Sequence, residues 1–172
     1  EQLNLESIKD EINKQYEQHV DKMNREWLSC LNQNAFNYES LSTPKQYDFY
    51  KNEIADLDQK VVVIISDALR YEAADDLLNT LHGDNKNIAE LRYCLASIPS
   101  KTNIGMAQLL PGNELQFNNG KVLVDGMNTD GLPAREKILS QTKNESKIIG
   151  FKELKSSKLE NLREIFKNKI VY

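Results

Sequence analysis

The segment VVVIISDALRYEAADDLL, residues 61–78, decides the fold, because a short β-branched run ends in one aspartate and passes directly into a helix. An apolar run of this length is typical of a strand buried on both faces in a parallel sheet. Ligands bind beyond the carboxyl ends of strands in open α/β sheets, and Asp67 stands at that position. Taken alone, Asp67 is more simply interpreted as an N-cap for the following helix.

Strands and helices alternate along the rest of the chain. The pattern predicts strands at residues 91–97, 121–126, 146–151 and from 170 onward, and helices at 68–83, 102–112, 134–142 and 155–169. Such alternation is typical of an α/β fold with a mainly parallel sheet flanked by helices. The chain stops at Tyr172, inside the last predicted strand, which indicates a fragment of a larger protein.

The residue pattern at the N-terminus predicts one long amphipathic helix. Apolar residues recur every three or four positions over residues 3–32, with charged and polar residues between them. So long a helix needs its apolar stripe to pack on the following domain or on a neighbouring chain. A polar segment follows, with a further helix predicted near Thr43 and Pro44. We therefore expect a helical N-terminal arm and linker over residues 1–58 and an α/β domain over residues 59–172.

The composition is that of a soluble globular protein, with 172 residues of which 40% are hydrophobic and 28% charged. No apolar run approaches the roughly 20 residues of a bilayer span, and the polar, acidic N-terminus does not resemble a signal peptide. We expect a cytoplasmic protein with no membrane partner. The net charge of −4 gives no whole-chain attraction for nucleic acid, so local chemistry has to hold any phosphate-bearing substrate. Cys30 and Cys94 lack metal-site spacing and are expected to be buried free thiols.

A second strand-to-helix corner, SIPSKT, lies at residues 97–102. Pro99 ends the predicted strand, and Ser100 and Thr102 follow where the next helix begins, with backbone amides pointing toward any bound anion. A hydroxyl there can act as a nucleophile toward phosphorus when a metal ion lowers its pKa. Helix capping is the structural alternative for both hydroxyls.

Three motifs together, VIISDALRYE, PSKT and VDGMNTDGLPAR, resemble the PglZ family of the alkaline phosphatase superfamily. The resemblance runs from about residue 60 to the end, and the N-terminal helix is similar to the region that precedes this domain in bacterial phage-exclusion proteins. It implies an alkaline-phosphatase-like domain of a metal-dependent phosphatase or phosphodiesterase in a BREX-type phage-defence system. The implied substrate is a phosphate ester, with nucleotides and DNA among the alternatives, and the N-terminal helix would dock onto other phage-defence proteins.

The resemblance also implies roles for individual residues. Asp67 matches the first metal-binding aspartate of the superfamily, and Thr102 matches the hydroxyl nucleophile that bridges metal and phosphate. Ser100 is the second candidate for the nucleophile. Asn103 would donate a hydrogen bond to a phosphoryl oxygen, as an asparagine near the nucleophile does in some relatives.

Two further assignments stay open. Arg70 would pair with phosphate or, in the simpler interpretation, form a structural ion pair with Glu72. Asp125, Thr129 and Arg135 belong to the third motif, whose role the sequence does not reveal. A turn at Asp125 followed by a helix that carries Arg135 is the structural interpretation.

The chemistry implied is phosphoryl transfer to Thr102 followed by attack of water, at a site with two divalent ions, zinc or alternatively manganese. The superfamily takes its other metal ligands from aspartates and histidines in the second half of the domain. Here the histidines are His19, on the N-terminal helix, and His82, beside the helix-ending Gly83, and both are expected at the surface. The metal site is therefore expected to be incomplete, and the chain inactive by itself.

Two other classes of function share features with this sequence. The chain would be a non-catalytic scaffold or interaction module of a defence complex if the apolar stripe of its N-terminal helix carried the function. A phospho-acceptor receiver domain also begins with a buried strand that ends in aspartate, but receivers need a pair of acids there. Here Ser66 precedes Asp67, and SIPSKT has no receiver counterpart.

Overall fold

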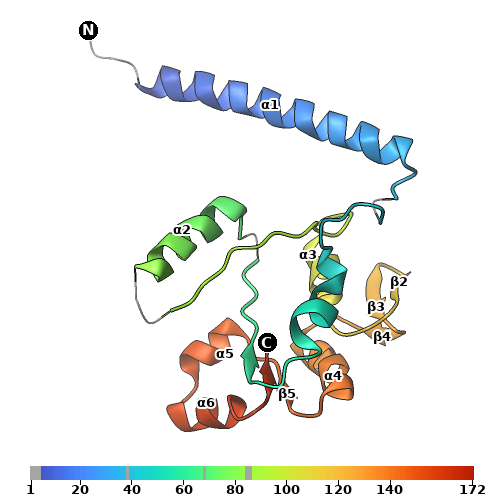
Figure 1. Ribbon diagram of the computed structural model, residues 1–172, viewed down its shortest axis with the longest axis vertical. Coiled ribbons are helices and arrows are strands. Elements are labelled where there is room, and N and C mark those ends of the chain that lie inside the picture. The colour runs from blue at the N-terminus through green and yellow to red at the C-terminus, as the bar shows by residue number, and fades with distance from the viewer. Residues whose placement is uncertain (1–4, 38, 68, 84–86) are drawn as a thin grey trace. The chain divides into compact units, whose positions relative to one another are not determined.

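The computed structural model describes residues 5–37, 39–67, 69–83 and 87–172, and the chain divides into two compact units, residues 1–42 and 43–172 (Figure 1). The first unit contains α1 (Leu5–Gln33), which confirms the long N-terminal helix. The helix ends in a Schellman motif, because the Phe36 amide donates to the Leu31 carbonyl at 2.7 Å and Ala35 has a φ of 50°. Its stripe is largely exposed, at Leu5, Ile8, Ile12, Tyr16, Met23, Trp27 and Leu28.

The second unit contains the predicted parallel sheet. Its strands are β1 (Val61–Val62), β5 (Ser146–Lys147) and β6 (Ile170–Val171), in the order β1-β6-β5. The prediction that the first strand is buried on both faces is wrong, because Val62 is 53% and Ile64 87% exposed. β1 lies at the edge of the sheet, and only the alternate residues 61, 63 and 65 face the core side and are half-buried.

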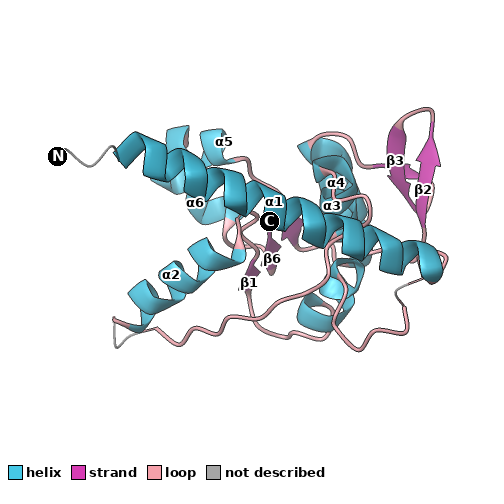
Figure 2. Cartoon of the chain, turned by 90° about the horizontal axis from the view of Figure 1, so that it is seen from above, coloured by secondary structure: helices cyan, strands magenta, loops and turns pink. Residues whose placement is uncertain are grey.

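A second, antiparallel sheet was not predicted. It consists of β2 (Leu115–Asn118), β3 (Lys121–Val124) and β4 (Met127–Asn128), and it lies apart from β1 and β6 (Figure 2). Asn119 and Gly120 join β2 to β3 with φ values of 48° and 76°, as a two-residue hairpin turn of type I′ requires. The strand expected at residues 121–126 is thus present as β3, with antiparallel partners.

The helices of the second unit largely follow the predicted order. They are α2 (Tyr71–His82), α3 (Thr102–Gln108), α4 (Leu132–Thr142), α5 (Phe151–Ser156) and α6 (Leu159–Ile165). A single helix at residues 155–169 is wrong, because the chain is extended at Ser157 and Lys158 between α5 and α6. The Ser156 hydroxyl donates to the Lys152 carbonyl at 3.0 Å, the kind of local bond by which serine weakens a helix. No helix among the described residues is both long and apolar enough to cross a bilayer.

The segment before β1 forms two short turns of helix where one helix was expected. These are the 3₁₀ turn η1 (Gln46–Asp48) and the π turn η2 (Tyr50–Ile54). Residues 43–58, predicted as arm and linker, therefore place Tyr50 and Ile54 in the core of the second unit. Around these two residues the core gathers Ile104, Ala107, Leu110, Val122, Val124, Ile138, Leu139, Ile148, Ile170 and Tyr172.

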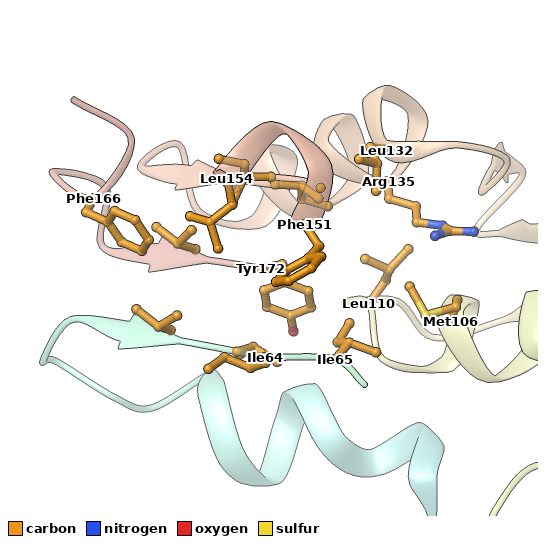
Figure 3. Close-up of a pocket in the computed structure, with 16 residues that line it drawn as sticks. Ile64, Ile65, Met106, Leu110, Leu132, Arg135, Phe151, Leu154, Phe166 and Tyr172 are labelled. Carbon is orange, nitrogen blue, oxygen red and sulfur yellow. The ribbon is translucent and has the colours of Figure 1, made fainter. Parts of the chain in front are cut away.

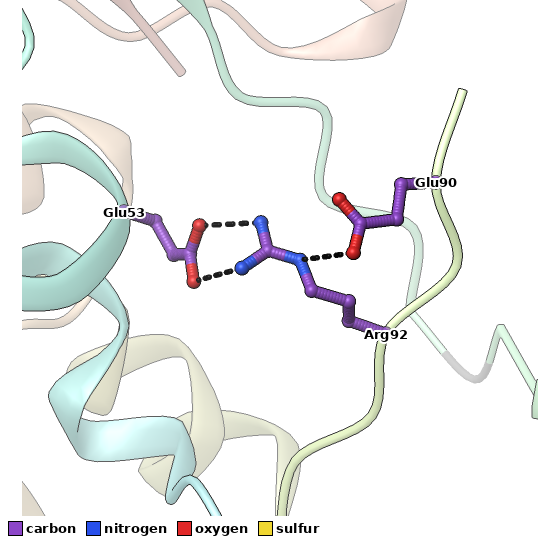
Figure 4. Close-up of polar contacts among 3 residues, drawn as sticks. All are labelled: Glu53, Glu90 and Arg92. Atoms are coloured by element: carbon purple, nitrogen blue, oxygen red, sulfur yellow. Dashed lines mark hydrogen bonds and ion pairs between the residues drawn. The ribbon is translucent and has the colours of Figure 1, made fainter. Parts of the chain in front are cut away.

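The strand predicted at residues 91–97 is wrong. Its backbone pairs only through an isolated parallel bridge between Lys45 and Leu95 among the described residues, and the rest of the segment runs extended without a ladder. Arg92 ties the segment to η2, since its two terminal nitrogens donate to the Glu53 carboxylate at 2.9 and 2.7 Å (Figure 4). Glu90 lies on the other side of the same guanidinium, 3.8 Å from its Nε.

Cys30 and Cys94 are free thiols, as expected, but the prediction that they are buried is wrong. Both are exposed, Cys30 on α1 and Cys94 on the extended segment that precedes Pro99. Both cysteines lie in segments that keep several apolar side chains exposed, so an apolar residue type did not by itself mean burial.

Candidate functional site

Asp67 stands in the turn that follows the continuation of β1. It is not the cap of α2, because that helix begins at Tyr71 with Arg70 in the N-cap position and has no side-chain capping bond. The simpler interpretation of the sequence is therefore wrong for this residue. The Asp67 side chain is exposed, and its carboxylate is available for a contact outside its own segment.

Thr102 supplies that contact. It is the first residue of α3, and the N-cap position belongs to Lys101, without a side-chain capping bond. The Lys101 amide donates to the Pro99 carbonyl at 2.9 Å, which turns the chain just before the helix. Thr102 Oγ1 then lies 3.5 Å from Asp67 Oδ2, a long hydrogen bond between residues 35 positions apart. The structure thus brings together the predicted nucleophile and the predicted metal ligand.

An open hollow of about 540 Å³ surrounds this pair. Ser100, the second candidate nucleophile, lines it together with Asp67 and Thr102. Gln46 and Lys101 also line it, although neither was predicted from the sequence. Gln46 comes from a polar segment without a motif, whereas Lys101 lies within the PSKT motif but had no predicted role.

The structure does not bring the remaining predicted contacts into this hollow. Asn103 and Arg70 are exposed, and neither is among the described residues that line it. The ion pairs among the described residues do not include one between Arg70 and Glu72, so the structural alternative for Arg70 has no support. Both residues stay candidates for contacts with a substrate that extends beyond the hollow.

The third motif has a structural role. The Asp125 carboxylate accepts hydrogen bonds from two backbone amides of the loop after α3, at 2.9 and 3.1 Å. The buried Thr129 hydroxyl donates to the Val122 carbonyl at 2.8 Å, and Arg135 Nε donates to the Thr129 carbonyl at 2.8 Å. The motif therefore fixes the β3–β4 turn and its junction with α4.

The spacing of the Asp67 and Thr102 oxygens fits a shared cation. Two oxygens on a tetrahedral zinc ion, each at about 2.0–2.2 Å, lie roughly 3.3–3.6 Å apart, and this pair is at 3.5 Å. The described residues contain no group of three or more His, Cys, Asp or Glu side chains that could complete such a site. His19 is exposed on α1, and the exposed His82 ring bonds the Ala89 carbonyl at 3.0 Å, so both histidines are at the surface as expected.

A second hollow, of about 340 Å³, is unsuited to the expected chemistry (Figure 3). Its lining is aliphatic and aromatic apart from Gly150, Arg135 and Tyr172. Arg135 bonds the Thr129 carbonyl, and the Tyr172 hydroxyl donates to the Leu109 carbonyl at 2.9 Å. Burial raises the pKa of Tyr172 above its ordinary range, so this phenol stays protonated. The polar groups converge instead in the hollow around Asp67 and Thr102.

Known proteins with similar sequences point to one family. Residues 48–172 match the family described as the BREX system PglZ alkaline phosphatase-like domain. Alkaline phosphatase-like protein BrxZ of Escherichia coli is 36% identical over 150 residues, which are 81% of this chain and 17% of that protein. Alkaline phosphatase-like protein PglZ of Bacillus cereus is 35% identical over 130 residues, 73% of this chain and 15% of that protein.

The chain spans about a sixth of the length of these curated relatives. No solved structure matches it. The family match nevertheless covers the whole α/β part, from the end of η1 to β6, and includes both Asp67 and Thr102. The chain belongs to the PglZ family of alkaline phosphatase-like domains.

Proposed function

We propose that the chain carries the nucleophile and one metal ligand of a phosphohydrolase that cleaves a phosphate ester in a phage-defence system. The observation that carries the proposal is the contact between Thr102 Oγ1 and Asp67 Oδ2, in an open hollow and without a capping role for either side chain. Membership of an alkaline phosphatase-like family supports it, since that superfamily usually uses divalent metal ions.

In the proposed reaction the Thr102 oxygen attacks phosphorus while the bond from phosphorus to the leaving oxygen breaks. Asp67 Oδ2 accepts the Thr102 hydroxyl hydrogen bond and so directs the other lone pairs of that oxygen into the hollow. The proton of the Thr102 hydroxyl passes to water and the leaving oxygen takes a proton from water, so the transfer leaves the number of protons unchanged. A second water molecule then hydrolyses the phosphothreonine, which releases the phosphorylated product and restores the hydroxyl. Ser100 is the alternative nucleophile, and Asn103 and Arg70 are proposed to bind phosphoryl oxygens.

Two divalent ions, zinc or alternatively manganese, would lower the pKa of the hydroxyl and neutralise phosphate charge when bound. Asp67 and Thr102 would hold one of them. The remaining ligands would come from outside the described residues, which is why we expect this chain by itself to be inactive. Phosphomonoesters, nucleotides and DNA are all candidate substrates, and a cytoplasmic location stays a prediction.

Zinc- or manganese-dependent hydrolysis of bis(p-nitrophenyl) phosphate by the full-length protein tests the proposal. We expect Thr102→Ala to reduce kcat by about three orders of magnitude or more, as removal of a nucleophile does, while the bound metal measured in the same sample stays present. Thr80→Ala, a change at an exposed helical threonine of α2, should leave the rate unaltered. Equal activity of the native protein and Thr102→Ala would contradict the assignment.

A non-catalytic interaction module is the second candidate. It is favoured by α1, whose apolar side chains are largely exposed along one stripe. An exposed apolar stripe of this kind is typical of a surface that another helix or protein covers. Other phage-defence proteins are the proposed partners, and this role is compatible with a catalytic domain in the same protein.

A further inference from the structure

One side chain, Gln46 of η1, joins the two flanks of the loop that carries Thr102. Gln46 Nε2 donates to the Gly105 carbonyl at 3.1 Å, and its Oε1 accepts from the Ser97 amide at 3.3 Å. Its backbone amide donates to the Leu95 carbonyl at 2.9 Å. Ser97 lies before the loop and Gly105 one turn into α3, so this amide group spans the segment that begins the helix.

Both partners of the Gln46 side chain need the bond that it provides. Gly105 is among the last four residues of α3, whose carbonyls have no partner within a helix. Ser97 is 3% exposed, and a buried amide without a partner is costly. A glutamine amide offers one acceptor and one donor group in a single plane, which matches this pair.

Gly105 leaves only just enough room for this contact. A Cβ atom at position 105 would lie 3.1 Å from Gln46 Nε2, closer than ordinary van der Waals contact. A methyl group at this position would therefore require the Gln46 amide to shift slightly. Gly105 thus allows the Gln46 amide to lie directly against the backbone of α3.

We propose that Gln46 is a positioning residue that holds the Thr102 hydroxyl at its distance from the Asp67 carboxylate. The inference rests on the proposed function, because it assigns Gln46 a part in the same reaction. Gln46 lies two positions before the segment that matches the family model, so its role follows from contacts in this chain. Its amide bonds Ser97 and Gly105 on either side of Thr102, and its proposed action is therefore through the position of Thr102.

Steady-state hydrolysis of bis(p-nitrophenyl) phosphate by the full-length protein tests this inference. Gln46→Met keeps the length of the side chain and removes both hydrogen bonds. We expect it to lower kcat by about 100-fold, the effect of a misplacement of about 1 Å, with KM unchanged. Gly105→Ala should lower kcat in the same direction because it displaces the amide.

Glu53→Gln is the matched control. It weakens the ion pair with Arg92, which is a second contact between the η turns and the extended segment before Ser97. Glu53 does not line the hollow around Thr102. We expect its kcat to equal that of the native protein. A general loosening of this region would instead lower kcat in Glu53→Gln as well, and that result would overturn the positioning role.

The outcomes separate this inference from the proposed function. If native activity depends on Thr102 but survives in Gln46→Met, the inference fails and the proposed function stands. If the native protein shows no Thr102-dependent activity, the proposed function fails. Amide hydrogen exchange over residues 97–108 then tests whether Gln46 holds this segment in place. Faster exchange in Gln46→Met than in the native protein and Glu53→Gln would support it, and equal exchange would overturn it.

Discussion

At the scale of single residues, the candidate site consists of side chains that do not cap the neighbouring helices. Aspartate before a helix and threonine at its start ordinarily serve as caps. Here Arg70 and Lys101 occupy the N-cap positions, so Asp67 and Thr102 keep their oxygens for each other. Asp125 is the opposite case, because its carboxylate accepts hydrogen bonds from two backbone amides and stabilises the fold.

Asp125→Ala should therefore destabilise the chain. The substitution leaves the amides of Asn113 and Glu114 without their acceptor and places alanine at a φ of 48°. We expect the free energy of unfolding to fall by about 1–2 kcal/mol, as measured by urea denaturation. Asp130→Ala, at an exposed aspartate in the same motif, should change it by less than about 0.5 kcal/mol. Equal losses in the two variants would contradict the assigned role of Asp125.

The residues of the site were only partly predictable. Asp67 and Thr102 follow strand-like runs and carry reactive groups, so the motif around each made them candidates. Their contact spans 35 positions and depends on tertiary structure that no local pattern encodes. No sequence pattern pointed to Gln46, because a single glutamine in a polar segment gives no indication whether it hydrogen-bonds a loop or faces solvent.

At the scale of elements, prediction succeeded where the signal is local. The β-branched run of β1 and the periodicity of α1 were sufficient to predict these two elements. The β2–β3 hairpin also had a local signal, Asn119-Gly120 between alternating residues, which the expectation of a parallel sheet obscured. The strand expected at residues 91–97 failed for a non-local reason, since a strand exists only where a neighbour pairs with it.

Helix α4 contributes the most completely buried leucine of the core, Leu139, which is 0% exposed. We expect Leu139→Ala to lower the free energy of unfolding by about 2–5 kcal/mol, because it removes buried methyl groups and leaves a cavity. Leu159→Ala deletes the same atoms from α6, where the side chain is 63% exposed. Its effect on urea unfolding should be several-fold smaller, and similar losses at both positions would contradict this core.

At the scale of the whole molecule, the order of the parallel sheet could not be read from the sequence. The last strand, β6, lies between β1 and β5, and it pairs Ile170 with both Val61 and Ser146. Such an order depends on contacts between opposite ends of the second unit. The first unit adds a separate question, because the stripe of α1 needs a surface to cover it.

We predict that this stripe binds a protein surface, and self-association of the chain is the case that can be measured without another phage-defence protein. Ile12→Lys with Met23→Lys places two charges among exposed apolar side chains of α1, which burial against a partner would have to desolvate. Gln18→Lys with Asn32→Lys adds the same charge to the opposite face of the helix. In sedimentation velocity at equal concentration, the native chain and the opposite-face variant should form oligomers, and the stripe variant should be monomeric. If all three sediment as monomers, self-association through the stripe is excluded, and the following domain or a different protein is left to cover it.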